Sequence, residues 1–292
     1  MSTLTRARLA LASITIIWGS TFPLGKIVLA YLPPFAYAAI RYSSATLLML
    51  LIYGRTVTTT WRKAWRQGIP IGFCLGLAYL TQTVGIANTS ANKAGFYTSI
   101  SVVLVPLLLA IWFKEKPTLR INLAVCLALV GILLLSDFWS EAMSFNGGDA
   151  LVIICAFFFA LHIILFDRLP EDCPRTTIVT QQFMVSALLS AVIAWGFEPF
   201  PSTTPPPHIW GLVIFLTLAA TVLAFSVMAW AQRYLSAPDT ALILILEPVF
   251  AAFFAWQWLG EALGVTAALG AMLILASLWL SSLPEASAKN AA

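Results

Sequence analysis

Long apolar stretches, separated by short polar or proline-rich segments, make up almost the whole chain. Because an α-helix rises about 1.5 Å per residue, roughly 20 apolar residues cross the ~30 Å hydrocarbon core of a bilayer. Each stretch has this length and therefore predicts one membrane-spanning helix. The ten predicted spans are residues 7–29, 34–53, 68–88, 91–113, 118–137, 148–167, 176–197, 207–231, 237–258 and 263–282.

The segments between the spans hold residues that end helices or face water. Pro33-Pro34, the polar run 54–67 and the proline-rich run 201–207 predict loops. The least distinct break lies at 88–92. Without it, spans three and four would form one helix of about 45 residues, which is too long for a bilayer. The pattern thus predicts an all-α integral membrane fold with short connections.

The composition agrees with a chain that lies almost entirely in lipid. Of its 292 residues, 60% are hydrophobic and only 10% are charged, with a mean hydropathy of +0.91. Soluble domains average about 25% charged residues. Ten spans leave no room for a separate soluble domain. The net charge of +4 comes from basic residues in short loops, so it does not indicate a nucleic-acid partner.

The basic residues predict how the chain is oriented. With both termini in the cytoplasm, the cytoplasmic segments contain all but three of the sixteen lysine and arginine residues, as the positive-inside rule requires. Of the exceptions, Lys26 and Lys93 lie near external ends of spans, where we expect them to snorkel to the interface as anchors. Arg41 lies within the second span.

The two halves of the chain resemble each other after a shift of 146 residues. Residues 1–137 and 148–283 are therefore predicted to be two repeats, followed by a short cytoplasmic tail at 284–292. Each repeat has five spans, an odd number, so the second must insert upside down relative to the first. Inverted repeats are typical of secondary transporters. The polar and tryptophan matches are Ser90-Ala91 with Ser236-Ala237, Trp112 with Trp258, Glu115 with Glu261, and Ser136 with Ser282.

Several short motifs occur in an order and spacing that resemble the drug/metabolite transporter superfamily, in particular its EamA branch of ten-helix carriers. The resemblance covers essentially the whole chain, as two EamA repeats. The motifs are Trp18-Gly19-Ser20-Thr21-Phe22, the residues from Phe35 through Arg41, those from Asn88 through Phe96, Leu246-Glu247-Pro248-Val249, and Gly260-Glu261.

The resemblance implies a carrier that moves amino acids, nucleosides, sugars or other metabolites across a bacterial inner membrane by alternating access. Some similar members export aromatic amino acids, and others export threonine, homoserine or cysteine-pathway metabolites. We therefore expect a small-molecule substrate and a lipid bilayer as partners, with protons as a candidate driving ion. A monomer and a weak homodimer both fit the resemblance. Export is favoured over import, without being fixed by the sequence.

Two ionisable residues inside spans are candidates for substrate contact, because charges in the membrane are expensive and usually face a cavity or a partner. Glu247 precedes Pro248, and proline leaves the carbonyl one turn earlier without its donor. The carboxylate could bind a proton or a substrate amine, or tie two helices together. Arg41 could attract a substrate carboxylate, snorkel to the interface, or bind backbone carbonyls. Asp239 is expected to cap the helix at 237–258, and Glu115 and Glu261 to be structural.

Polar and aromatic residues in other spans are candidates for the walls of a cavity. Rings combined with amide and hydroxyl groups suit a partly apolar substrate. Tyr79 and Gln82 are three residues apart and share a helix face. The alternative is that each ring only packs the core or belongs to an interfacial belt. The candidates are Trp18, Thr21, Tyr79, Gln82, Tyr97, His162 and Trp230.

Two other classes of membrane protein fit the sequence less well than a carrier does. A membrane-embedded enzyme would need a nucleophile and a base held together, but the sequence contains no HExxH or GxSxG motif and only two histidines, far apart. A channel would need a recurring filter loop or a ring of identical groups, and neither is visible. We read the four cysteines as small core residues and expect no metal and no cofactor.

Overall fold

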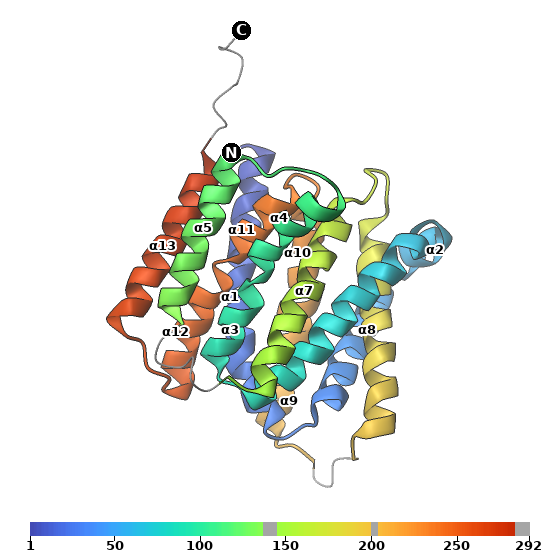
Figure 1. The fold of residues 1–292 in the computed structure, drawn as a ribbon. Helices are drawn as coiled ribbons and strands as arrows, with labels where there is room; N and C mark the ends of the chain where they lie inside the picture. Colours follow the sequence, from blue (N-terminus) through green and yellow to red (C-terminus); the bar gives the residue numbers. More distant parts are fainter. Residues whose placement is uncertain (137–144, 200–203, 284–292) are drawn as a thin grey trace.

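The computed structural model describes residues 1–136, 145–199 and 204–283, and all regular structure in these ranges is helical (Figure 1). The predicted tail at 284–292 lies outside the described residues. The helices, in chain order, are α1 (Thr3–Leu29), α2 (Pro34–Asn88), α3 (Ala91–Ser99), α4 (Ser101–Trp112), α5 (Leu119–Leu135), α7 (Gly147–Asp167), α8 (Arg175–Phe197), α9 (Pro207–Thr217), the π-helical turn η2 (Leu218–Leu223), α10 (Ala224–Ala231), α11 (Ala237–Leu244), α12 (Glu247–Leu259) and α13 (Val265–Ser282).

Helix α2 corrects one predicted boundary, because the expected loop at 54–67 is helical. The helix nevertheless folds back on itself: the rings of Tyr42 and Tyr79 are 5.2 Å apart, whereas a straight helix would separate them by about 55 Å. Figure 1 shows the ribbon turning over at one end of the bundle. The hydroxyls of Thr58, Thr59 and Thr60 donate to carbonyls of the preceding turn. Such back-bonding bends a helix without ending it.

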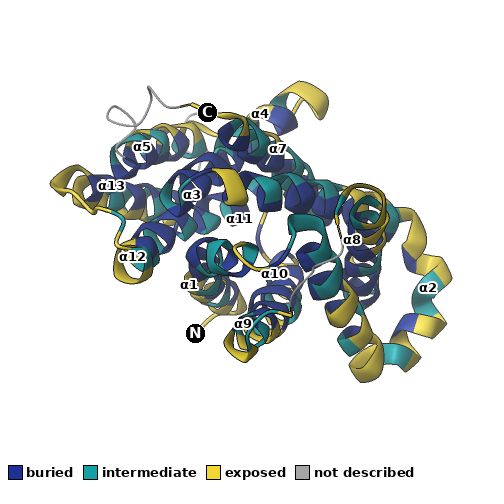
Figure 2. Cartoon of the chain, turned by 90° about the horizontal axis from the view of Figure 1, so that it is seen from below, coloured by how far each residue is buried: buried dark blue, intermediate teal, exposed yellow. Residues whose placement is uncertain are grey.

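The predicted class, an all-α membrane protein, is confirmed. In the described ranges, eight helices are long and apolar enough to cross a membrane, and α5 is a shorter apolar helix. Those eight count α2 once, although the sequence divides it into two spans, so the predicted number of ten stays a prediction. Figure 2 shows the most buried residues in the middle of the bundle. Large apolar side chains such as Leu51 (74% exposed) and Val192 (71% exposed) lie on its outside, where lipid would cover them.

The crossing of α5 and α13 depends on two glycines. A Cβ atom at Gly270 would lie 2.4 Å from the carbonyl oxygen of Gly131 and 2.4 Å from the amide nitrogen of Leu135. Both atoms belong to the backbone and cannot move aside as a flexible side chain would. The absence of side chains therefore lets the two helices pack backbone to backbone.

We expect Gly270→Ala to destabilise the protein, because the helices would have to separate. Overpacking of this kind costs about 1–3 kcal/mol, and a lower Tm in detergent would report it. The matched control is Gly196→Ala in α8, where a new Cβ meets nothing within 4 Å. That change should leave Tm unaltered or raise it slightly. Equal Tm values for the two variants would contradict the close packing.

Three of the predicted spans are interrupted near their middles. The span at 91–113 divides into α3 and α4 at Ile100, six residues before Pro106, which therefore does not cause the break. The span at 237–258 divides into α11 and α12 just before Glu247, where Pro248 supplies no N–H. The π-turn η2 interrupts the span at 207–231. Such breaks free backbone groups at membrane depth, as in transporters that bind substrate at the midplane.

Candidate functional site

A cavity lies where the broken helices meet α1, the second half of α2 and α7. It brings together six of the residues selected from the sequence, although they come from four helices spread over more than 200 positions. These six are Trp18, Thr21, Tyr79, Gln82, His162 and Glu247. Further lining residues include Thr98, Ser101, Phe159 and Phe225, which the sequence analysis did not select.

Glu247 is the first residue of α12 and lines the cavity. The positive end of the α12 dipole favours a negative charge at this position. Gly19 lets α1 approach closely here, because a Cβ at that position would lie 2.9 Å from the carbonyl oxygen of Glu247. Within the described residues, the Glu247 carboxylate forms no hydrogen bond and no ion pair. The alternative interpretation, a glutamate that ties two helices together, thus finds no partner in this part of the chain.

Amide, hydroxyl and imidazole groups form the polar part of the wall. Gln82 Nε2 donates to Thr98 Oγ1 at 3.2 Å, which links α2 to α3. His162 Nε2 lies 2.8 Å from Gln182 Oε1 on α8. With the amide oriented this way, Nε2 of the imidazole carries a proton and donates it. These bonds hold two of the polar side chains in fixed orientations around the cavity.

Aromatic rings form the apolar part of the wall, with Phe225 at its centre. The Phe225 ring centroid lies 5.2 Å from Trp18 and 6.2 Å from Tyr79, and Phe159 lies 5.2 Å from Tyr79 in an edge-on contact. Trp18 Nε1 donates to the carbonyl oxygen of Ala220 at 2.8 Å. Ala220 belongs to η2, so the π-turn supplies the acceptor that fixes the indole ring.

Arg41 lies behind Tyr79 rather than in the cavity wall. Its side chain is buried, with the guanidinium carbon 5.3 Å from the centre of the Tyr79 ring. Nε donates to Thr221 Oγ1 at 2.7 Å and Nη1 to the Tyr37 hydroxyl at 3.4 Å. Nη2 has no hydrogen-bond partner in the described structure, and no carboxylate of the described residues forms an ion pair with Arg41. Of the alternatives open from the sequence, snorkelling of Arg41 to the interface does not fit this buried position.

Tyr97 and Trp230 do not reach the cavity. Tyr97 is buried against Phe96, with ring centroids 4.9 Å apart. Trp230 is 38% exposed and packs on Tyr234 at 5.6 Å, on the outside of the bundle. The structure does not bring these two predicted residues together with the other candidates.

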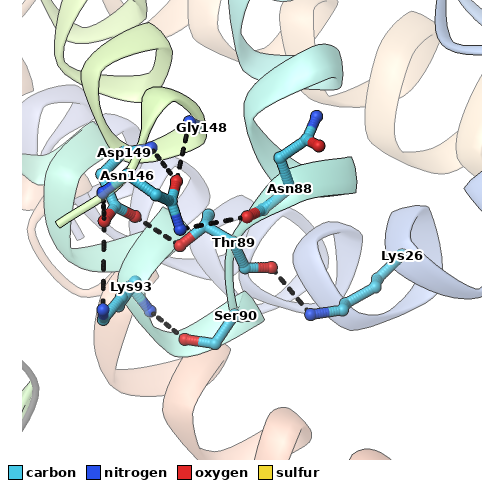
Figure 3. A network of polar contacts seen from close by, with 8 residues as sticks. All are labelled: Lys26, Asn88, Thr89, Ser90, Lys93, Asn146, Gly148 and Asp149. Atoms are coloured by element: carbon cyan, nitrogen blue, oxygen red, sulfur yellow. Dashed lines mark hydrogen bonds and ion pairs between the residues drawn. The ribbon is translucent and has the colours of Figure 1, made fainter. Parts of the chain in front are cut away.

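Two expectations about charged residues near span ends are wrong. Lys93 is not an exposed anchor: it is buried, and its Nζ lies 3.9 Å from Oδ2 of the fully buried Asp149 (Figure 3). The N-cap of α11 is Ser236 rather than Asp239, because the serine side chain accepts from the Asp239 amide. Asp149 lies only two residues inside a span and is not among the residues selected from the sequence.

A helical membrane bundle with broken helices around a polar and aromatic cavity defines a polytopic transport protein. The EamA-like transporter family matches residues 6–137 and again residues 146–283. The chain belongs to this family.

Similar proteins agree with this membership. An uncharacterized transporter of Archaeoglobus fulgidus is 35% identical, over 95% of this chain and 86% of its own length. A protein of Salmonella typhimurium named a probable amino-acid metabolite efflux pump is 22% identical, over 92% of each chain. A solved crystal structure superposes with a TM-score of 0.79 at 17% identity, over 95% of this chain and 96% of the other, and so shares the fold.

Proposed function

We propose that this transporter exports amino acids, aromatic ones among the candidates, across a bacterial inner membrane with both termini in the cytoplasm. The observation that carries the proposal is the Glu247 carboxylate, which lines the cavity without a partner in the described structure. The Salmonella relative's name supports the same substrate class.

The cavity suits a molecule with an amine and an apolar side chain. The partly buried Glu247 carboxylate attracts an ammonium group, because a charge-assisted hydrogen bond is about twice as strong as a neutral one. The rings of Trp18, Phe159 and Phe225 offer an apolar surface next to it. A nucleoside or sugar, which lacks a permanent positive charge, would leave Glu247 unpaired.

Arg41 provides the opposite charge on the other side of Tyr79. A buried cation without a counter-ion is costly in the membrane, and a ligand anion would reduce that cost. If the Tyr79 ring turns away, a substrate carboxylate can reach Nη2 while its ammonium group stays near Glu247. The two charges thus match the zwitterion of a free amino acid.

Transport would follow from exchange between two conformations of the repeats, 1–137 and 148–283, inserted in opposite orientations. The two family matches, one in each half, support this division. The breaks between α3 and α4 and between α11 and α12 lie beside the cavity, where a change of angle between the helix halves would alter its walls. A proton on Glu247 could replace the substrate ammonium on the return step and supply the driving force.

The test is transport by the purified protein in liposomes, with labelled amino acids, nucleosides and sugars, with and without a pH gradient. We expect saturable counterflow of amino acids and none of nucleosides or sugars. Counterflow of another class would overturn the proposed substrate. Linear, non-saturable flux would indicate a channel, and chemical conversion of the substrate in detergent would indicate an enzyme.

A further inference from the structure

A buried polar network, drawn in Figure 3, joins four segments at the end of the bundle opposite the N-terminus, which Figure 1 marks. Its centre is Asp149 of α7, which is fully buried. Thr89 Oγ1 donates to Asp149 Oδ1, and Lys93 Nζ lies 3.9 Å from Oδ2. Lys26 Nζ in turn donates to the Thr89 carbonyl oxygen at 2.7 Å. The network therefore ties α1, the connection after α2, and α3 to the start of α7.

The same end of α3 is also held from the other half of the chain. The two carboxylate oxygens of Glu261, which follows α12, accept hydrogen bonds from the backbone N–H groups of Ala91 and Asn92, each at 3.1 Å. A carboxylate is favoured at a helix N-terminus by the free N–H groups and the helix dipole. Helix α3, which contributes Thr98 to the cavity wall, is thus fixed at one end by Asp149 and Glu261 together.

The ion pairs at the opposite end of the bundle are exposed. Arg168 pairs with Glu115 at 2.5 Å, and their side chains are 37% and 53% exposed. Lys63 pairs with Asp172 at 2.5 Å, with side chains 55% and 72% exposed. The hydrogen bond and positive charge of Lys63 lower the pKa of Asp172. Exposed pairs of this kind contribute little to holding helices together.

The repeat correspondence shows why the two ends differ. Glu115 occupies the position of Glu261 in the first repeat, yet it binds Arg168 instead of the N-terminus of α11. Pro238 stands where the second repeat would need the counterpart of Asn92, and proline has no N–H to donate. The first repeat therefore cannot form, at the N-terminus of α11, the two backbone hydrogen bonds that Glu261 accepts at α3.

We propose that Asp149 and Lys93 form a latch that keeps the end opposite the N-terminus closed, and that this end opens only when Lys93 and Thr89 separate from Asp149. In the proposed orientation this is the external end, so the latch controls release of substrate. The inference rests on alternating access as the mode of transport and goes beyond it by naming the residues of one gate.

Cysteine accessibility tests the latch directly. The reporter is Ser101→Cys in the cavity wall, in a full-length chain whose four native cysteines are replaced by alanine. A membrane-impermeant methanethiosulfonate reagent is added outside intact cells. We expect Asp149→Asn and Lys93→Met to raise the labelling rate by about tenfold or more, because each removes one partner of a buried ion pair. Lys63→Met, which breaks an exposed pair, is the matched control and should change nothing.

Asp149 Oδ2 also accepts a hydrogen bond from the backbone N–H of Asn146 in the capping box of α7. A purely structural role of Asp149 must therefore be separated from the latch. Asparagine at 149 retains a side-chain oxygen for this bond. A purely capping role therefore predicts little effect of either Asp149→Asn or Lys93→Met on the labelling rate, and that outcome would overturn the proposal. An effect of Asp149→Asn without one of Lys93→Met would overturn it too. A latch predicts that the double variant opens no further than either single variant. Faster labelling from the cytoplasmic side alone would also overturn it.

Hydrogen exchange of the protein with its native cysteines gives a second readout. In Asp149→Asn and in Lys93→Met, the amides of residues 89–93 should exchange about tenfold faster, while those of α5 should not change. Unchanged exchange in both variants would overturn the latch. Neither measurement needs a transported substrate, so failure of the amino-acid proposal in liposomes is distinguishable from failure of the latch.

Discussion

Replacing Glu247 with glutamine is expected to lower amino-acid counterflow by about 10- to 100-fold, since hydrogen bonds to charged groups contribute about 1.5–3 kcal/mol. Glutamine has nearly the same shape and still lines the cavity, but it offers an ammonium group no charge. The yield and Tm of the purified protein should not fall, because Glu247 holds no hydrogen bond or ion pair in the described structure. Initial rates of counterflow in liposomes, compared at equal protein incorporation, give the measurement.

The matched control for this variant is Glu171→Gln, which removes one carboxylate from the exposed connection between α7 and α8. Its counterflow should equal that of the unaltered protein. If protons also bind at Glu247, the residual counterflow in Glu247→Gln should no longer depend on the pH gradient. Unaltered counterflow and unaltered pH dependence in Glu247→Gln would exclude this carboxylate from the mechanism.

The spans could be predicted from the sequence because their signal is local. Each needs about 20 apolar residues in a row, and a bilayer permits few other arrangements of such a stretch. The segment 54–67 was mistaken for a loop because its charges and threonines indicate only that it leaves the lipid. Its backbone nevertheless stays helical, with the threonine hydroxyls bonded to carbonyls of the previous turn, and polarity alone does not reveal that.

The helix breaks were harder to predict because their causes differ. Pro248 marks the break before α12 in the sequence itself. The break at Ile100 follows Ser99, whose hydroxyl donates to the Phe96 carbonyl oxygen, and no proline or glycine lies at the break. The π-turn at 218–223 is a stretch of small and apolar residues, and its role becomes visible only when Trp18 is seen bonded to Ala220.

Ionisable and amide groups of the candidate site could be found from the sequence because polar groups are costly, and therefore rare, inside membranes. Glu247, Gln82 and His162 are conspicuous within apolar spans, because lipid penalises each of them. Phe159 and Phe225 were missed since a phenylalanine in a span has no feature that separates a cavity wall from ordinary packing. Asp149 was missed because it lies two residues inside the end of a span. An acidic residue at such a position is usually an exposed helix cap.

Replacing Arg41 with glutamine is expected to have the second large effect, and the effect should depend on the substrate's carboxylate. For L-phenylalanine, a probe amino acid with a free carboxylate, we expect the apparent affinity to fall by about 10- to 100-fold, the range for a lost charge-assisted bond. Phenethylamine has the same ring and amine without the carboxylate. Phenethylamine should inhibit amino-acid counterflow more weakly than L-phenylalanine does. The strength of that inhibition should be the same in the unaltered protein and in Arg41→Gln.

The comparison of the two probes separates recognition from folding. If Arg41 had only a structural role, replacing it would lower the apparent affinity for both probes equally. The walls formed by Tyr79 and Phe225 would then shift for each of them. Arg41→Lys keeps the charge but loses the fork of donors that holds Thr221 and Tyr37, so it should recover only part of the L-phenylalanine affinity. Since Arg41 faces the cavity only past the Tyr79 ring, Tyr79→Phe should keep carboxylate discrimination. Equal loss for both probes in Arg41→Gln would remove the carboxylate from the role proposed for this arginine.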